Sequence, residues 1–118
     1  MIENTSQTVR HISAKIPEAE IQLAKAYIQG AVHSHCNNNS VMEFSVRILF
    51  GRENSDWKNT PLQCIYEYHK NIKKAKDPAG EAAKDVGWLL KAVLTEDART
   101  FEYVGKDTGG IYKMRQSG

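Results

Sequence analysis

The sequence predicts an α+β domain in which three helices are followed by a C-terminal β-hairpin. Apolar residues recur at helical spacing in three separate segments, and near the C-terminus the period changes to two. The chain has 118 residues, of which 41% are hydrophobic and 25% charged, a composition typical of one globular domain. We therefore expect residues 17–115 to form a single domain and residues 1–16 to be a disordered N-terminal segment.

The first helix is predicted over residues 17–35. Pro17 suits the first helical position, and the acidic residues that follow it favour the positive end of the helix dipole. The predicted buried face comprises Ile21, Ala24, Ile28 and Val32, widened by Leu23 and Tyr27. The run Asn37-Asn38-Asn39-Ser40 is expected to end the helix, because such side chains compete for backbone hydrogen bonds.

Residues 43–50 are compatible with either a strand or a helix. Phe44, Val46, Ile48 and Phe50 alternate as in a strand, whereas Val46, Leu49 and Phe50 fit one helical turn. Periodicity does not separate the two for so short an apolar run, so both remain open. A loop is predicted over 51–55, and Trp57 is expected to plug the edge of the core.

A second helix is predicted from Thr60 to Lys74. Thr60 can cap it, Pro61 fits the first helical position, and Gln63 stands where a capping box places Glu or Gln. One apolar stripe is expected to follow, formed by Leu62, Ile65, Tyr66, His69 and Ile72. Asp77-Pro78 should end this helix and cap the next.

The third helix is predicted over 79–96, followed by the hairpin. Its buried face comprises Val86, Leu89, Leu90, Val93 and Leu94, and its opposite face carries Lys84, Trp88, Lys91 and Thr95. Strands are expected over 99–106 and 111–115. They are joined across Asp107-Thr108-Gly109-Gly110, where the glycines would supply positive φ.

This order of helix, short strand, helix, turn, helix and hairpin resembles the winged-helix variety of helix-turn-helix domain. Residues 60–74 match the support helix, 79–96 the recognition helix and 99–115 the wing, which implies a three-helix winged-helix-like domain. The C-terminal half also resembles the winged-helix modules that end some phage and plasmid replication proteins. The resemblance implies a non-catalytic protein that binds double-stranded DNA, as a regulator or accessory factor of a mobile element.

The charge distribution agrees with a DNA contact in the second half of the chain. The formal net charge is only +2, but residues from Arg47 onward carry 13 basic and 10 acidic side chains, against 3 and 4 before it. Contacts from lysine to phosphate give salt-sensitive binding with little base discrimination. The candidate DNA-binding residues are Lys73, Lys74, Lys76, Lys84, Trp88, Lys91, Lys106, Lys113 and Arg115.

Other readings of the same residues remain open. Trp88 departs from the Arg, Asn, Gln or Ser usual on a base-reading helix, so its face could instead bind a protein partner or form a homodimer. The lysines could also be no more than a solvated surface. His33, His35 and Cys36 are potential zinc ligands for a zinc-dependent activity, although they lack the paired spacing of structural zinc sites.

Enzymatic and membrane functions have little support in the sequence. No nucleophile with an orienting base and no phosphate-binding loop is recognisable, so no catalytic residue, cofactor or metal is predicted. No apolar run approaches the ~20 residues needed to span a bilayer, so no membrane partner is expected. Two cysteines, Cys36 and Cys64, do not form a disulfide framework, and a cytoplasmic location is expected.

Overall fold

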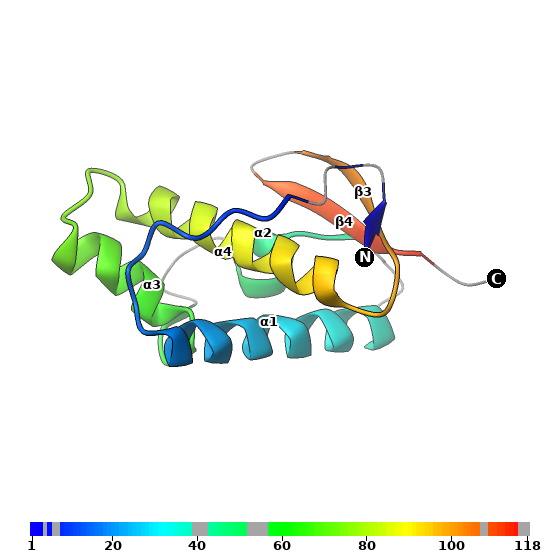
Figure 1. The fold of residues 1–118 in the computed structure, drawn as a ribbon, viewed down its shortest axis with the longest axis horizontal. Coiled ribbons are helices and arrows are strands. Elements are labelled where there is room, and N and C mark those ends of the chain that lie inside the picture. Colours follow the sequence, from blue (N-terminus) through cyan, green and yellow to red (C-terminus); the bar gives the residue numbers. More distant parts are fainter. Residues whose placement is uncertain (4, 6–7, 39–42, 52–56, 107–108, 116–118) are drawn as a thin grey trace.

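The computed structural model describes residues 1–3, 5, 8–38, 43–51, 57–106 and 109–115 (Figure 1). Its architecture is α+β, as predicted, and the predicted first and third helices correspond to α1 and α4. The elements in chain order are β1 (Ile2–Glu3), α1 (Glu18–Asn38), β2 (Glu43–Phe44), α2 (Val46–Phe50), α3 (Gln63–Glu67), the π-helical turn η2 (Tyr68–Ile72), α4 (Pro78–Glu96), β3 (Phe101–Lys106) and β4 (Gly110–Met114).

The described strands form one mixed sheet in the order β1-β3-β4-β2. β3 and β4 form the predicted antiparallel hairpin, with Tyr103 opposite Tyr112, while β2 pairs antiparallel with β4 and β1 pairs parallel with β3. Of the predicted turn, Asp107 and Thr108 lie outside the described residues. Gly110 is the first residue of β4, and the positive φ predicted for it was wrong. A Cβ atom on Gly110 would lie 2.8 Å from the Tyr112 hydroxyl, so glycine permits a close approach there.

Residues 43–50 form both of the structures that the sequence left open. Glu43 and Phe44 make β2, and Val46–Phe50 makes α2. The change occurs at Ser45, whose Oγ accepts a hydrogen bond from the Ile48 amide at 3.3 Å and so caps the helix. Phe44 is fully buried, with its ring centroid 6.0 Å from that of Phe101.

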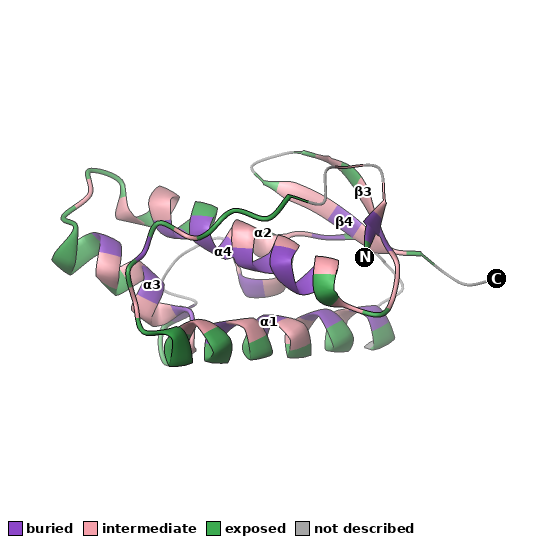
Figure 2. Ribbon diagram, in the orientation of Figure 1, coloured by how far each residue is buried: buried purple, intermediate pink, exposed green. Residues whose placement is uncertain are grey.

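The hydrophobic core lies between α1, α4 and one face of the sheet (Figure 2). Trp57 is 3% exposed, which confirms its predicted place at the core. Leu23 and Tyr27 were expected to widen the buried face of α1, and this was wrong, because they are 61% and 37% exposed. The predicted buried faces are otherwise confirmed for Ala24, Ile28 and Val32 of α1 and for Val86, Leu89, Leu90, Val93 and Leu94 of α4.

The second predicted helix differs from its expected course. The α-helical part begins at Gln63 and ends at Glu67, and a π-helical turn follows it. The capping pattern is shifted as well, because Oε1 of Gln63 accepts from the Asn59 amide at 2.9 Å and Oγ1 of Thr60 accepts from the Leu62 amide at 3.2 Å. A π turn takes one residue more than an α turn, so it moves the following side chains out of the apolar stripe. Ile72 was therefore wrongly assigned to that stripe.

The N-terminal residues pack against the rest of the molecule. After β1, residues 8–17 run along α4 before they enter α1 (Figure 1). Ile2 and Ala14 are 1% and 4% exposed and belong to the hydrophobic core. The segment 8–17 is hereafter the N-terminal strap.

A charged contact sets the course of the chain from α4 into β3. The Asp97 carboxylate accepts hydrogen bonds from Nη2 of Arg99 at 2.9 Å and from Nε2 of Gln29 at 2.6 Å. These bonds, led by the one from Arg99, hold the pKa of the Asp97 carboxyl well below its usual range. The Arg99 guanidinium also lies 5.3 Å from the ring centroid of Phe101, so the first residue of β3 is held close to the end of α4.

Candidate nucleic-acid interface

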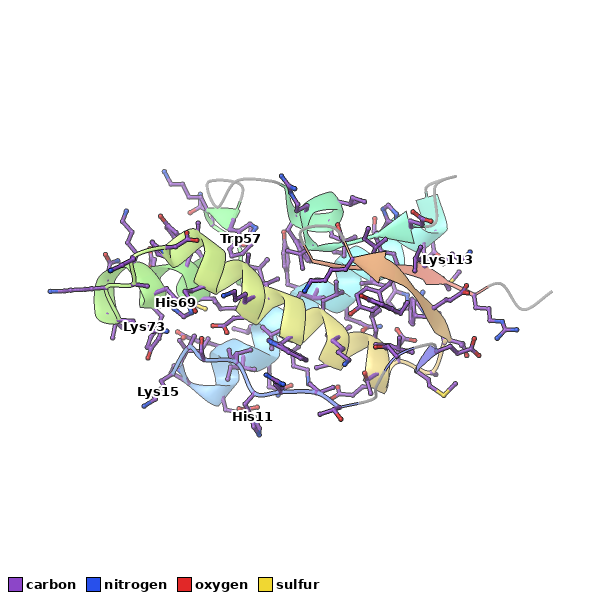
Figure 3. All side chains as sticks on the ribbon, turned by 90° about the horizontal axis from the view of Figure 1, so that it is seen from above. His11, Lys15, Trp57, His69, Lys73 and Lys113 are labelled. Atoms are coloured by element: carbon purple, nitrogen blue, oxygen red, sulfur yellow. The ribbon has the colours of Figure 1, made fainter. Side chains whose placement is uncertain are left out.

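The densest basic segment of the chain lies between α3 and α4. Residues 70–76, hereafter the lysine turn, contain four exposed lysines: Lys70, Lys73, Lys74 and Lys76. Figure 3 shows Lys73 near one end of the molecule, whose longest dimension is 47 Å. Lys74 has φ of 52°, which lets the chain turn back sharply. Asp77 then caps α4 by accepting from the Gly80 amide at 3.0 Å, as predicted.

Acidic side chains neutralise only part of this charge. A carboxylate oxygen of Glu81 lies 3.8 Å from Nζ of Lys73, and the other lies 3.8 Å from Nζ of Lys84. Within the described residues, Lys74 and Lys76 make no ion pair. The Lys84 side chain is 74% exposed on the first half of α4. The start of α4 and the turn before it therefore form one exposed positive surface.

The middle of α4 is partly covered by the N-terminal strap. The Arg10 guanidinium lies 5.4 Å from the Trp88 ring centroid, and Nζ of Lys91 lies 5.5 Å from it. Trp88 and Lys91 are half-buried. Trp88 was predicted on the outward face of the recognition helix, and in the structure it stacks with cations of its own chain. An incoming partner could reach this part of α4 only beside the strap.

The cations of the hairpin form a separate group. Nζ of Lys113 lies 3.6 Å from a Glu102 carboxylate oxygen, and a guanidinium nitrogen of Arg115 lies 2.7 Å from Glu3. Lys106 is exposed and has no ion pair with a described residue. Lys113 and Lys73 lie at opposite ends of the molecule (Figure 3). The structure thus brings together Lys73, Lys74, Lys76 and Lys84 and places Lys113 far from them.

A buried carboxylate in α4 joins three parts of the chain. Asp85 is 2% exposed and accepts hydrogen bonds from the Ser13 amide at 2.8 Å, the Ala14 amide at 3.1 Å and the Ser13 hydroxyl at 3.0 Å. Nε2 of the fully buried His69 lies 2.7 Å from Oδ2, the oxygen that also accepts from the Ala14 amide, and donates to it, since a carboxylate can only accept. Although it directly follows the exposed Lys84 in the sequence, Asp85 is not part of the exposed surface. It fastens the N-terminal strap and η2 to α4.

Two residues of this region were missed as functional candidates. Asp85 interrupts the apolar stripe of α4, one residue before Val86 and four before Leu89, and this position was the signal for its burial. Ile72 is 73% exposed, and its polar neighbours Asn71 and Lys73 were the signal in the sequence.

The histidines and cysteines do not gather into a metal site in the part of the chain that the structure describes. Cys36 lies in the core, where burial raises the pKa of its thiol. His33 contacts the Gln29 side chain, and His35 contacts the backbone carbonyl of Glu43. Burial likewise raises the pKa of the Cys64 thiol, which donates to the Pro61 carbonyl.

A surface hollow between α1 and the end of α4 is lined by polar groups that already pair with each other. Lys25 binds Glu96 at 3.1 Å, and Gln29 binds Asp97. The structure offers no unpaired polar side chain there to select a ligand among the residues it describes.

No protein-family model, curated protein or solved structure matches the chain. Among the described residues, no helix combines the length and the apolar character needed to cross a bilayer.

Proposed function

We propose that this protein is a non-catalytic, double-stranded DNA-binding protein of the winged-helix type. The observation that carries the proposal is the exposed group of Lys73, Lys74, Lys76 and Lys84. It lies on a helix–turn–helix unit whose second helix is fixed by its cap and by the buried Asp85. A helix of ~10–12 Å diameter fits the major groove of B-DNA.

The strand pairing supports the winged-helix interpretation. The elements α1, β2, α3, α4, β3 and β4 follow one another in the order that the resemblance implies. The three strands after α1 pair in the order β2-β4-β3, which supplies the first strand that a three-stranded wing sheet needs. Two additions depart from that plan, namely β1 at the outer edge of β3 and α2 between β2 and α3.

The partner class follows from the charge on this surface. Lys74 and Lys76 have no acidic partner among the described residues, so each can bind a phosphate without first breaking an ion pair. Lys73 and Lys84 share a single acid, Glu81, at 3.8 Å, whereas Lys113 and Arg115 each pair with an acid of their own, Glu102 and Glu3. The main DNA contact is therefore assigned to the lysine turn and the first half of α4, with the hairpin in a secondary role. Lysine contacts of this kind position the protein and distinguish bases poorly.

The salt dependence of duplex binding tests this function. Four lysine–phosphate contacts give a slope of log K against log salt of about −3 to −4, so affinity should fall roughly a hundredfold between about 50 and 200 mM salt. Fluorescence anisotropy with a labelled random-sequence duplex measures this slope. Replacing Lys74 and Lys76 together with glutamine should make the slope shallower by about 2.

The control variant for this titration is Lys25→Gln on α1, which removes a cation that already pairs with Glu96 of α4. It should leave the slope unchanged. Absence of binding at about 50 mM salt, or a slope near zero, would refute the proposed function.

A further inference from the structure

The most exposed large apolar side chain that the structure describes lies inside the lysine turn. Ile72 is 73% exposed, against 61% for Leu23 and 55% for Ile48. Its sequence neighbours within two positions are Lys70, Asn71, Lys73 and Lys74. Ile72 is not part of the hydrophobic core, and it is the one large apolar side chain among the exposed lysines of this turn.

The backbone that presents Ile72 is unusual at two successive points. Ile72 ends the π-helical turn η2, in which the Lys73 amide donates to the Tyr68 carbonyl at 2.9 Å. Lys74 then has a positive φ of 52°, and the Ala75 amide donates to the His69 carbonyl at 2.9 Å. Single π turns and strained non-glycine residues are uncommon and concentrate at functional sites. Ile72 stands where these two features meet.

We propose that Ile72 inserts as a wedge between base pairs of duplex DNA from the minor groove, while the lysines beside it bind the flanking phosphates. This inference rests on the proposed DNA-binding function and specifies how the lysine turn contacts the duplex. Proteins that kink DNA insert single apolar side chains, isoleucine among them, between base steps and surround them with cations. The apolar residue meets the base faces, and the charged residues meet the backbone on either side.

The surroundings of Ile72 favour DNA over the other anionic surface, a phospholipid bilayer. A segment that binds at a bilayer interface presents an apolar face built from several side chains. Ile72 stands alone, because the residues on both sides of it are polar or charged. In a duplex, phosphates lie on either side of a stacked base step. One apolar side chain could therefore contact the base step while the lysines on either side of it contact the phosphates.

Two optical measurements on one duplex test the wedge at constant low salt. The duplex carries 2-aminopurine at flexible TA steps, whose fluorescence rises on unstacking, and a donor–acceptor pair at its ends reports bending. The intact protein should raise both signals on binding. Ile72→Ala should bind roughly tenfold more weakly with the same salt slope, and at saturation it should give neither signal.

The matched control is Leu23→Ala, which removes another highly exposed apolar side chain on α1. It should bind and bend DNA as the unchanged protein does. Ile72→Ala should also keep the melting temperature of the unchanged protein, because the side chain is exposed.

The possible outcomes separate this inference from the proposed function. Salt-dependent binding without unstacking or bending, or signals that survive Ile72→Ala, would refute the wedge alone. Absence of binding to any duplex would refute the proposed function and the wedge together. Ile72-dependent binding to vesicles of anionic phospholipid, with none to the duplex, would assign this surface to membranes and would overturn both.

Discussion

Replacement of Asp85 by alanine is expected to lower the free energy of unfolding by about 3–5 kcal/mol, because it leaves buried donors without an acceptor. The buried donors are the Ala14 amide and Nε2 of His69, and the partly buried Ser13 amide loses its acceptor as well. At roughly 4 °C per kcal/mol for a domain of this size, the melting temperature should fall on the order of 15 °C. Differential scanning calorimetry measures both quantities.

Glu81→Ala provides the matched control for this variant. It removes a carboxylate from the same helix one turn earlier, and that carboxylate makes only 3.8 Å ion pairs with lysines. Its effect should stay within about 0.5 kcal/mol. In Asp85→Ala, hydrogen exchange should accelerate most at the amides of Ser13 and Ala14. A loss below about 1 kcal/mol would mean that Asp85 does not hold the N-terminal strap to α4.

Reversal of charge at Lys74 and Lys76 is expected to weaken duplex binding by at least about a hundredfold at low salt. Each substitution by glutamate removes a phosphate contact, at roughly tenfold each, and adds a repulsive charge. Both side chains are exposed and have no ion pair with a described residue, so the melting temperature should change little. Anisotropy titration of the variant against the unchanged protein gives the ratio of affinities.

A double substitution in the hairpin makes the same change of charge at the other predicted DNA contact. Lys106→Glu combined with Lys113→Glu alters the net charge by the same amount, but Lys113 already pairs with Glu102. This double variant should weaken binding only a few-fold, through the general field of the protein. If the hairpin variant lost more affinity than the Lys74/Lys76 variant, the main contact would lie on the wing.

The helices with a continuous apolar period were predictable from the sequence. For α4, the stripe from Val86 to Leu94 and the Asp77-Pro78 start are local signals that agree with each other. The hairpin was predictable for the same reason, since alternation and turn residues are both local. The α+β class follows directly from these elements.

The features that shape the candidate site depend on non-local contacts. The partner of Asp85 in the strap is Ser13, which lies 72 residues earlier in the chain. No pattern in the polar N-terminal segment predicts that contact. The π turn inserts one residue into a stripe that otherwise keeps a helical period, so Ile72 was placed inside instead of outside. The candidate lysines were found from their positions on the predicted elements, but the separation of Lys73 from Lys113 required the fold (Figure 3).

The most direct test of the DNA interface is to map it by NMR, following the backbone amide shifts of the protein as a short random-sequence duplex is added at low salt. The account predicts that the largest shifts occur in residues 70–84, with smaller changes in the hairpin residues 101–115. Shifts confined to the hairpin, or to the outer face of α1, would contradict it.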